Sequence, residues 1–183
     1  MTFRTAARAT FPEPTRPGVR RATGAAAQMP VDILICGTTD RHDDGVALAA
    51  APYLRQQAPA GTRVLVVGQL DIDDLLAVPP NGGVVIVDAA SGLRPGHILE
   101  LPLDGFIDRA DDIRPRSSHA LAFREVIGVA TLVRRFPLPG RIVAIGGSRW
   151  SLGVGLSPRV ARAMPALVET VLRAVASLRT SRT

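Results

Sequence analysis

The sequence predicts an α/β sandwich built on a mostly parallel, twisted sheet. Short continuous apolar runs, typical of strands that are buried on both faces, alternate along the chain with longer segments of helical periodicity. Strands and helices that alternate in this way form βαβ units, whose strands run parallel. The chain has 183 residues, 46% of them hydrophobic, which is enough for one domain with a proper core.

The amino-terminal half is expected to supply three strands and two helices. Aliphatic runs predict strands over residues 33–36, 63–67 and 83–87. Apolar residues at helical spacing predict a helix over 45–57, and a shorter helical piece is predicted at 72–77. This order gives two successive strand–helix–strand units.

The carboxyl-terminal half is expected to complete the sheet and its helical layers. An edge strand is predicted at 97–101, followed by a polar loop over 104–116 and a helix over 118–135. A further strand at 141–145 ends at a Gly-Gly pair, and a Ser-Pro start opens the last helix, over 157–178. The apolar stripe of the helix over 118–135 is expected to consist of Leu121, Val126, Val129, Leu132 and Val133.

Residues 1–29 are predicted to form a disordered tail, and residues 30–180 the folded domain. The tail is rich in arginine, alanine and proline and shows no sustained periodicity. Arg20-Arg21 resembles a twin-arginine pair, but no apolar stretch follows it that could serve as a signal core. No apolar run approaches the roughly 18–20 residues that a membrane helix needs, so no membrane association is expected.

Charge and cysteine content narrow the class of protein further. All 22 basic residues are arginine, and the net charge of +6 is spread along the chain. No basic helix is interleaved with aromatic residues, so a nucleic-acid partner is not expected. The single cysteine, Cys36, lies in a predicted buried strand. It cannot form an internal disulfide, which fits a reducing cytoplasm, and its burial argues against a nucleophile.

Two carboxylates and one imidazole are the candidates for chemistry. Asp44 closes a polar run after the first strand, Asp88 ends the apolar run of the third, and His119 opens the helix over 118–135. Strand ends and helix starts converge at one edge of an open parallel sheet, where such folds bind ligands. Two carboxylates and one histidine there predict a site for a divalent metal. Because it contains no thiolate, this site would be weak and oxygen-rich, unlike a permanent structural zinc site.

Each candidate also has a simpler explanation. Either acid that ends the 40–44 run could cap the following helix, since helix starts attract negative charge. Asp88 could form a turn, and His119 could be exposed and uninvolved. His42 lies beside the acidic run and could contribute to the site, whereas His97 is most simply structural.

The glycine-rich segments do not predict a nucleotide site. Gly146-Gly147 and Gly153-Val154-Gly155 lack the spacing between a strand and an immediate helix that a phosphate-binding fingerprint needs. The loop between them contains Arg149 and Trp150. This pair could contact a partner protein if it is exposed, or Trp150 could pack the loop against the domain.

Taken together, four stretches resemble the hydrogenase maturation endopeptidases. Residues 33–46 look like that family's opening strand and its acidic-acidic-Gly-Val motif. Residues 85–89 look like its strand ending in Asp-Ala, and residues 117–119 like its Ser-His helix start. Residues 155–160 look like its closing Gly-Leu-Ser helix, and order and spacing agree over about residues 31–178.

The resemblance implies a fold, an activity and a set of site residues. The implied fold is a three-layer α/β/α sandwich of the phosphorylase/hydrolase-like kind. The implied activity is a metal-dependent cytoplasmic endopeptidase that removes the C-terminal extension of a nickel–iron hydrogenase large-subunit precursor after nickel insertion. Asp44, Asp88 and His119 would be its catalytic and metal-contacting residues. They would recognise nickel in the substrate and not bind it permanently, and the protein is expected to be a monomer.

Two departures from the family pattern keep alternatives open. The family reads Gly-x-Gly-Asn after its first strand, whereas this chain has Gly37-Thr38 without the asparagine. The loop before Gly155 lacks the family's acidic residue and reads Arg149-Trp150-Ser151-Leu152. A second hypothesis is therefore a metal-sensing binding or maturation factor that does not cleave. A small-molecule or nucleotide-binding α/β domain is a third, against which the missing phosphate loop counts.

Overall fold

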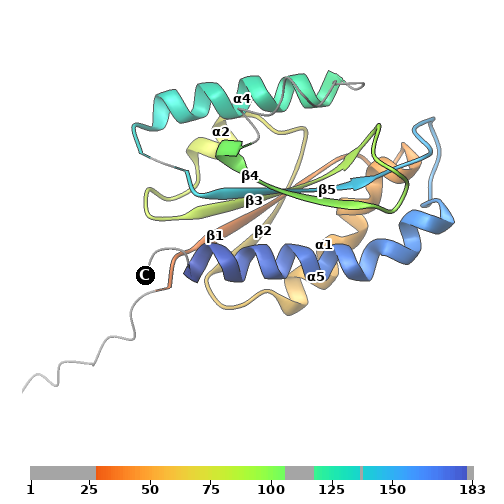
Figure 1. The fold of residues 1–183 in the computed structure, drawn as a ribbon, viewed down its shortest axis with the longest axis horizontal. Helices are drawn as coiled ribbons and strands as arrows, with labels where there is room; N and C mark the ends of the chain where they lie inside the picture. The colour runs from red at the N-terminus through yellow and green to blue at the C-terminus, as the bar shows by residue number, and fades with distance from the viewer. Residues whose placement is uncertain (1–27, 106–117, 137, 181–183) are drawn as a thin grey trace, which may run out of the picture.

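The computed structural model describes residues 28–105, 118–136 and 138–180, except for the side chains of 118–122. The described residues form a five-stranded sheet with the strand order β2-β1-β3-β5-β4 (Figure 1). The strands are β1 (Val31–Cys36), β2 (Thr62–Gly68), β3 (Gly83–Ala90), β4 (Ile98–Pro102) and β5 (Gly140–Gly146). The helices are η1 (His42–Gly45), α1 (Val46–Gln57), α2 (Ile72–Leu76), α4 (Ser118–Arg134) and α5 (Pro158–Thr180).

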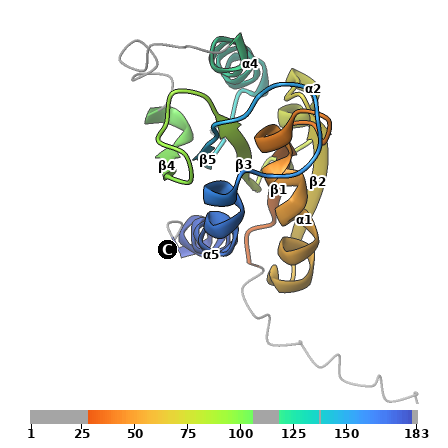
Figure 2. The same cartoon turned by 90° about the vertical axis from the view of Figure 1, so that its right-hand side faces the viewer.

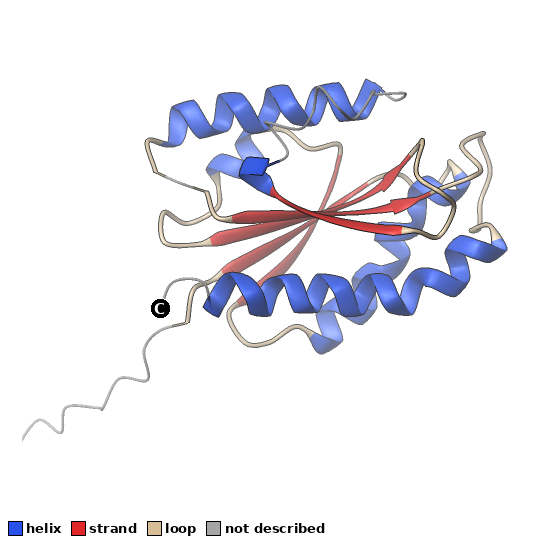
Figure 3. Cartoon of the chain, viewed as in Figure 1, coloured by secondary structure: helices blue, strands red, loops and turns tan. Residues whose placement is uncertain are grey.

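The architecture confirms the predicted three-layer sandwich. β1 pairs in parallel with β2 and β3, and β3 pairs in parallel with β5. β4 is an antiparallel edge strand next to β5. Helices α1 and α5 cover one face of the sheet, and α2 and α4 cover the other (Figure 3).

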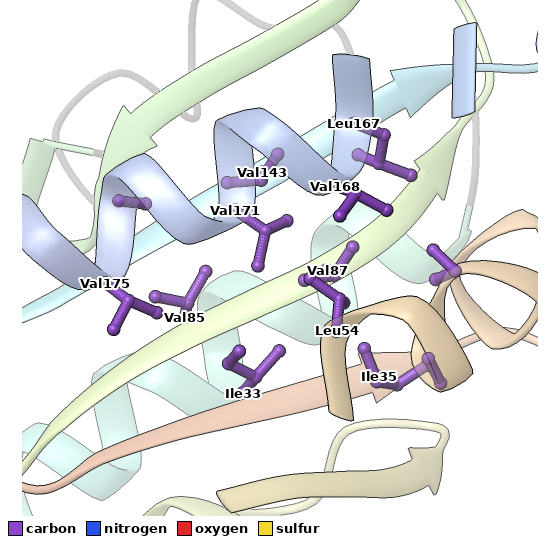
Figure 4. Close-up of a cluster of buried hydrophobic side chains, with 14 of the residues drawn as sticks. Ile33, Ile35, Leu54, Val85, Val87, Val143, Leu167, Val168, Val171 and Val175 are labelled. Atoms are coloured by element: carbon purple, nitrogen blue, oxygen red, sulfur yellow. The ribbon is translucent and has the colours of Figure 1, made fainter. Parts of the chain in front are cut away.

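Side chains of successive strand residues alternate between two hydrophobic clusters. Ile33 and Ile35 of β1 face α1 and α5, where they pack against residues such as Val171 (Figure 4). Leu34 and Cys36 face α2 and α4. Because the central strands are buried on both faces, their sequences are continuous apolar runs, the signal that predicted them.

Strand β3 is longer than its apolar run. It continues to Ala90, so Asp88 lies inside the strand and pairs with Ala144 of β5 instead of following the strand end. Val84 and Ile86 pack in the cluster under α2 and α4. By the two-residue alternation of a strand, the Asp88 side chain projects to that same face.

The predicted apolar stripe of α4 is wrong, although the bounds of the helix agree with the prediction. Phe123, Ile127 and Ala130 form the buried face. Val126 is half-buried against them, and the side chain of Leu121 lies outside the described residues. The remaining members of the predicted stripe are exposed: Val129, Leu132 and Val133.

The start of the fold also differs slightly from the prediction. Met29, which was assigned to the tail, is buried in the core under α5. Its carbonyl oxygen accepts a hydrogen bond from Arg179 Nε at 3.2 Å, so the packed part of the chain begins before residue 30. Residues 1–27, the rest of the predicted tail, lie outside the described residues. None of the helices in the described part of the chain is long and apolar enough to cross a membrane.

Candidate active site at the carboxyl edge of the sheet

Asp44 and Asp88 lie at the point where the strand order reverses. The chain leaves β1 and passes through η1, which contains Asp44, while Asp88 lies near the end of the neighbouring strand β3. β1 connects onward to β2 on one side and pairs with β3 on the other. Open α/β sheets bind ligands in the crevice outside such a switch point. The structure therefore brings these two predicted residues to one edge, which faces the viewer in Figure 2.

A main-chain hydrogen bond fixes the Asp44 carboxylate. Asp44 is 3% exposed, and its Oδ2 accepts the Thr38 N–H at 2.8 Å. Neither η1 nor α1 has a side-chain hydrogen bond that caps its start, so the acidic run does not cap these helices by hydrogen bonding, although Asp43 and Asp44 lie in the first turn of η1. Asp44 is held by the loop that follows β1, beside the edge of the sheet.

Asp88 is a buried carboxyl group with an unsatisfied oxygen. It is 7% exposed, and Asp88 Oδ1 has no hydrogen-bond partner among the described residues. Burial raises the pKa of Asp88 to about 7, the Ala89 N–H opposes that rise, and the negative charge of Asp44 adds to it. A carboxyl group with such a pKa exchanges its proton at neutral pH.

Cys36 lies near both acids but is chemically quiet. It is 1% exposed on the α2–α4 face. Burial raises the pKa of the Cys36 thiol far above its usual range, and the charges of Asp88, Asp74 and Asp44 raise it further. The thiolate is the reactive form, so the structure agrees with the expectation that Cys36 is not a nucleophile.

The third candidate, His119, is placed by its backbone alone. Helix α4 begins at Ser118, and its amino-terminal end lies toward the carboxyl edge of the strands (Figure 1). The His119 side chain lies outside the described residues. Among the side chains that the structure describes, no three from His, Cys, Asp and Glu are grouped so that they could hold a metal ion.

Asp43 joins η1 to the segment between β5 and α5 by hydrogen bonds, a role that the sequence did not predict. Its Oδ2 accepts the N–H groups of Ser148 at 2.8 Å and Arg149 at 3.0 Å, and the Ser148 hydroxyl at 3.2 Å. Its Oδ1 accepts the Ser157 N–H at 2.6 Å. Burial acts to raise the pKa of Asp43, but these donors outweigh it and lower the pKa. In the sequence, Asp43 is only an acidic residue near Gly45, and its partners lie in serine-containing turns more than 100 residues later.

Solved structures share this architecture. The hydrogenase maturating endopeptidase HybD from E. coli superposes with a TM-score of 0.70 over 81% of this chain and 93% of that chain, at 20% identity. The [NiFe] hydrogenase maturation protease HybD from Thermococcus kodakarensis gives 0.67 over 79% and 98%, at 23% identity. The chain has the hydrogenase maturation endopeptidase fold. HycI from Thermococcus kodakarensis, another [NiFe] hydrogenase maturation protease, gives 0.62 over 82% and 95%, at 18% identity. No family model matches the sequence, and no curated protein sequence matches it.

Within this maturation-endopeptidase fold, the β5–α5 loop (residues 147–157) runs beside η1 (Figure 2). Trp150 is half-buried and packs against the core cluster under α1 and α5, so the packing explanation holds for Trp150. Arg149 is exposed. His42, which could contribute to the site, contacts this loop through Gly155 and Arg149. His97 precedes β4, and its main-chain N–H donates to the Arg94 carbonyl.

Proposed function

We propose that this chain is an endopeptidase that removes the C-terminal extension of a nickel–iron hydrogenase large-subunit precursor after nickel insertion. The observation that carries the proposal is the pair of buried carboxyl groups, Asp44 and Asp88, at the switch point of a maturation-endopeptidase fold. Four motifs in register with that family, including the Ser118-His119 helix start, support it independently of the fold.

The donor set suits a metal ion that arrives with the substrate. Asp88 Oδ1 is a buried oxygen without a hydrogen bond among the described residues, and a cation would satisfy it. Asp44 adds a second carboxylate, and His119 is expected to add an imidazole. Nickel, as part of the substrate, would polarise the scissile carbonyl or lower the pKa of a water molecule. Without thiolates these residues bind weakly, so they would sense nickel held mainly by the substrate.

The chain's own residues position the substrate metal and handle protons. The Thr38 N–H holds one oxygen of the Asp44 carboxylate. Without a bound cation the pKa of Asp88 is about 7, so part of the population carries a proton at neutral pH. A bound nickel ion would favour the carboxylate, so Asp88 would release that proton as the substrate metal arrives. The different environments of Asp44 and Asp88 thus suit them to different roles: Asp44 is a fixed carboxylate, and Asp88 can also carry a proton.

The decisive experiment incubates the full chain with a hydrogenase large-subunit precursor from the same genome, with and without nickel, and reads intact mass. We expect loss of a C-terminal peptide only with nickel-loaded precursor and wild-type protein. Asp44→Ala, Asp88→Ala and His119→Ala should each abolish the loss. Asp73→Asn, which changes an exposed acid on α2, serves as the matched control and should cleave normally. Cleavage that persists in Asp44→Ala or His119→Ala would refute the assigned roles.

A non-cleaving, metal-sensing maturation factor is the second candidate. The observation that favours it is Thr38, which stands where the family carries an asparagine. Its hydroxyl donates to Asp40, and its side chain has no amide to supply to the site. If the nickel-loaded precursor binds tightly while its mass stays unchanged over hours, this candidate replaces the endopeptidase.

A further inference from the structure

Two aliphatic side chains stand in solvent at the site edge. Leu152 is 72% exposed and Val154 is 81% exposed, and both belong to the β5–α5 loop. Single exposed aliphatic residues are common, but an adjacent pair on a fixed loop beside a candidate active site is a feature of contact surfaces.

Main-chain hydrogen bonds fix this loop in place. The Gly153 N–H donates to the Asp40 carbonyl at 2.8 Å, and the His42 N–H donates to the Gly153 carbonyl at 2.9 Å. These bonds form an isolated parallel bridge between Arg41 and Gly153. The Asp43 N–H donates to the Arg149 carbonyl at 3.1 Å, in addition to the bonds that its carboxylate accepts. Leu152 and Val154 flank the bridged residue, so both are held at a defined position.

The His42 side chain completes the attachment. Its Nδ1 lies 3.1 Å from the Gly155 carbonyl oxygen, and its Nε2 lies 3.2 Å from Arg149 Nη2. A carbonyl only accepts and a guanidinium only donates. Both contacts are hydrogen bonds at the same time only when Nδ1 carries a proton and Nε2 does not. Its backbone has a φ of +50°, a conformation that few residues other than glycine and asparagine adopt readily.

We propose that the β5–α5 loop is a docking element for the folded protein substrate, with Leu152 and Val154 as its apolar contact and His42 as its positioning residue. The inference rests on the proposed function and names the surface by which that substrate is recognised. A protein that presents a metal to Asp44 must approach this edge, and Asp43, the preceding residue, holds the loop there. On the substrate, the surface that Leu152 and Val154 contact is an aliphatic patch close to the metal.

The physical advantage of a fixed loop is a smaller entropy loss on binding. A flexible loop would have to be ordered as the complex forms, which weakens affinity. Here the ordering is completed during folding by bonds from Asp40, His42 and Asp43. Loss of either the aliphatic contact or the attachment should therefore raise KM and the dissociation constant and leave kcat nearly unchanged.

The first test replaces the contact itself. The double variant Leu152→Ser/Val154→Ser should raise KM and the dissociation constant for nickel-loaded precursor roughly 10- to 100-fold, with kcat within about twofold of wild type. Leu132→Ser is the matched control, because Leu132 is 82% exposed on α4 and makes no part of this edge. It should leave both constants unchanged. A double variant that binds and cleaves like Leu132→Ser would overturn the inference.

The second test replaces the positioning residue. His42→Gly keeps the positive φ and removes both side-chain contacts, so it should raise KM by about tenfold. His42→Asn also tolerates that φ and keeps a donor for the Gly155 carbonyl, so it should recover part of the loss. Ring-nitrogen NMR shifts should report the Nδ1–H tautomer in wild type, and Arg149→Ala should alter them. An Nε2–H tautomer, or full activity of His42→Gly, would contradict the role of His42.

Direct binding separates this inference from the proposed function. If the wild type binds nickel-loaded precursor without cleaving it, the endopeptidase assignment fails. Weaker binding by Leu152→Ser/Val154→Ser would then still support docking. If the wild type cleaves and the double variant matches it in binding and KM, docking alone fails. If the wild type does not bind the precursor at all, both proposals are overturned.

Discussion

A side chain on Gly37 would overlap the main-chain carbonyl oxygen of Asp44. Gly37 directly follows β1, with a φ of +103°, and the chain returns over it as η1. The close approach lets the Thr38 N–H reach the Asp44 carboxylate at 2.8 Å. The position of one candidate metal-contacting residue thus depends on a missing side chain seven residues earlier.

Gly37→Ala should therefore displace Asp44 as well as destabilise the fold. We expect a loss of several kcal/mol in the free energy of unfolding, from backbone strain and overlap together, and loss of cleavage. Gly92→Ala is the control, because Gly92 has a φ of +91° and open space where a Cβ would stand. Its cost should be limited to about 1–2 kcal/mol. Urea unfolding of both variants measures the difference, and equal losses would exclude the overlap.

Asp88→Asn should stabilise the protein at alkaline pH. The folded-state pKa of about 7 lies above the usual carboxyl value, so stability is full in acid and falls as pH rises toward and through 7. The amide cannot ionise, so Asp88→Asn should gain up to about 4 kcal/mol at pH 8 and little near pH 4. Urea unfolding across this range tests it, with Asp73→Asn as the control. A gain independent of pH would argue against burial of an ionising group.

Asp43 should show the opposite pH dependence. Its folded-state pKa is lowered, so the stability that it contributes is present above the unfolded-state value and is lost as pH falls. Asp43→Ala leaves N–H groups of Ser148, Arg149 and Ser157 without their acceptor, which should cost about 2–4 kcal/mol at pH 7. The difference from wild type should shrink toward pH 3. A constant difference across pH would contradict this assignment.

Thr38→Val should leave cleavage intact. The variant removes the hydroxyl that donates to Asp40 but keeps the main-chain N–H that holds Asp44. Because Asp40 is exposed, we expect a stability loss of at most about 1 kcal/mol and a kcat within about twofold of wild type. The precursor assay measures kcat directly. A large fall in kcat would show that the Thr38 side chain takes part in the chemistry.

The order of elements was predictable because burial on both faces leaves a plain signal. The predicted apolar runs over 33–36 and 83–87 have no polar interruption, and they lie within β1 and β3, which also include the buried acids Asp32 and Asp88. The inward face of α4 was not predictable in the same way. Helix α4 has two apolar arcs, and periodicity alone does not choose between them. The buried arc consists of Phe123, Ile127 and Ala130, and the exposed arc of Val129, Leu132 and Val133.

The site was predictable only in part, for a related reason. Asp44 follows the first apolar run and Asp88 the third, and the carboxyl ends of parallel strands meet at one edge of the sheet. Asp43 and His42 act through contacts with residues more than 100 positions away, which no local pattern encodes. For the same reason, the sequence did not predict the hydrogen bonds that attach the β5–α5 loop to η1. His119 remains a prediction from its motif, with its backbone placed at the start of α4.

The bonds from Asp43 to Ser148 and Ser157 span 105 and 114 residues of sequence. During synthesis on the ribosome, β1 and η1 emerge long before Ser148, Arg149 and Ser157, which donate hydrogen bonds to the Asp43 carboxylate. The nascent chain therefore cannot assemble a working edge until almost its whole length has been made. A premature stop before residue 148 would remove every donor to the Asp43 carboxylate together with α5, and the shortened product should be a substrate for cellular quality control instead of a partly active enzyme.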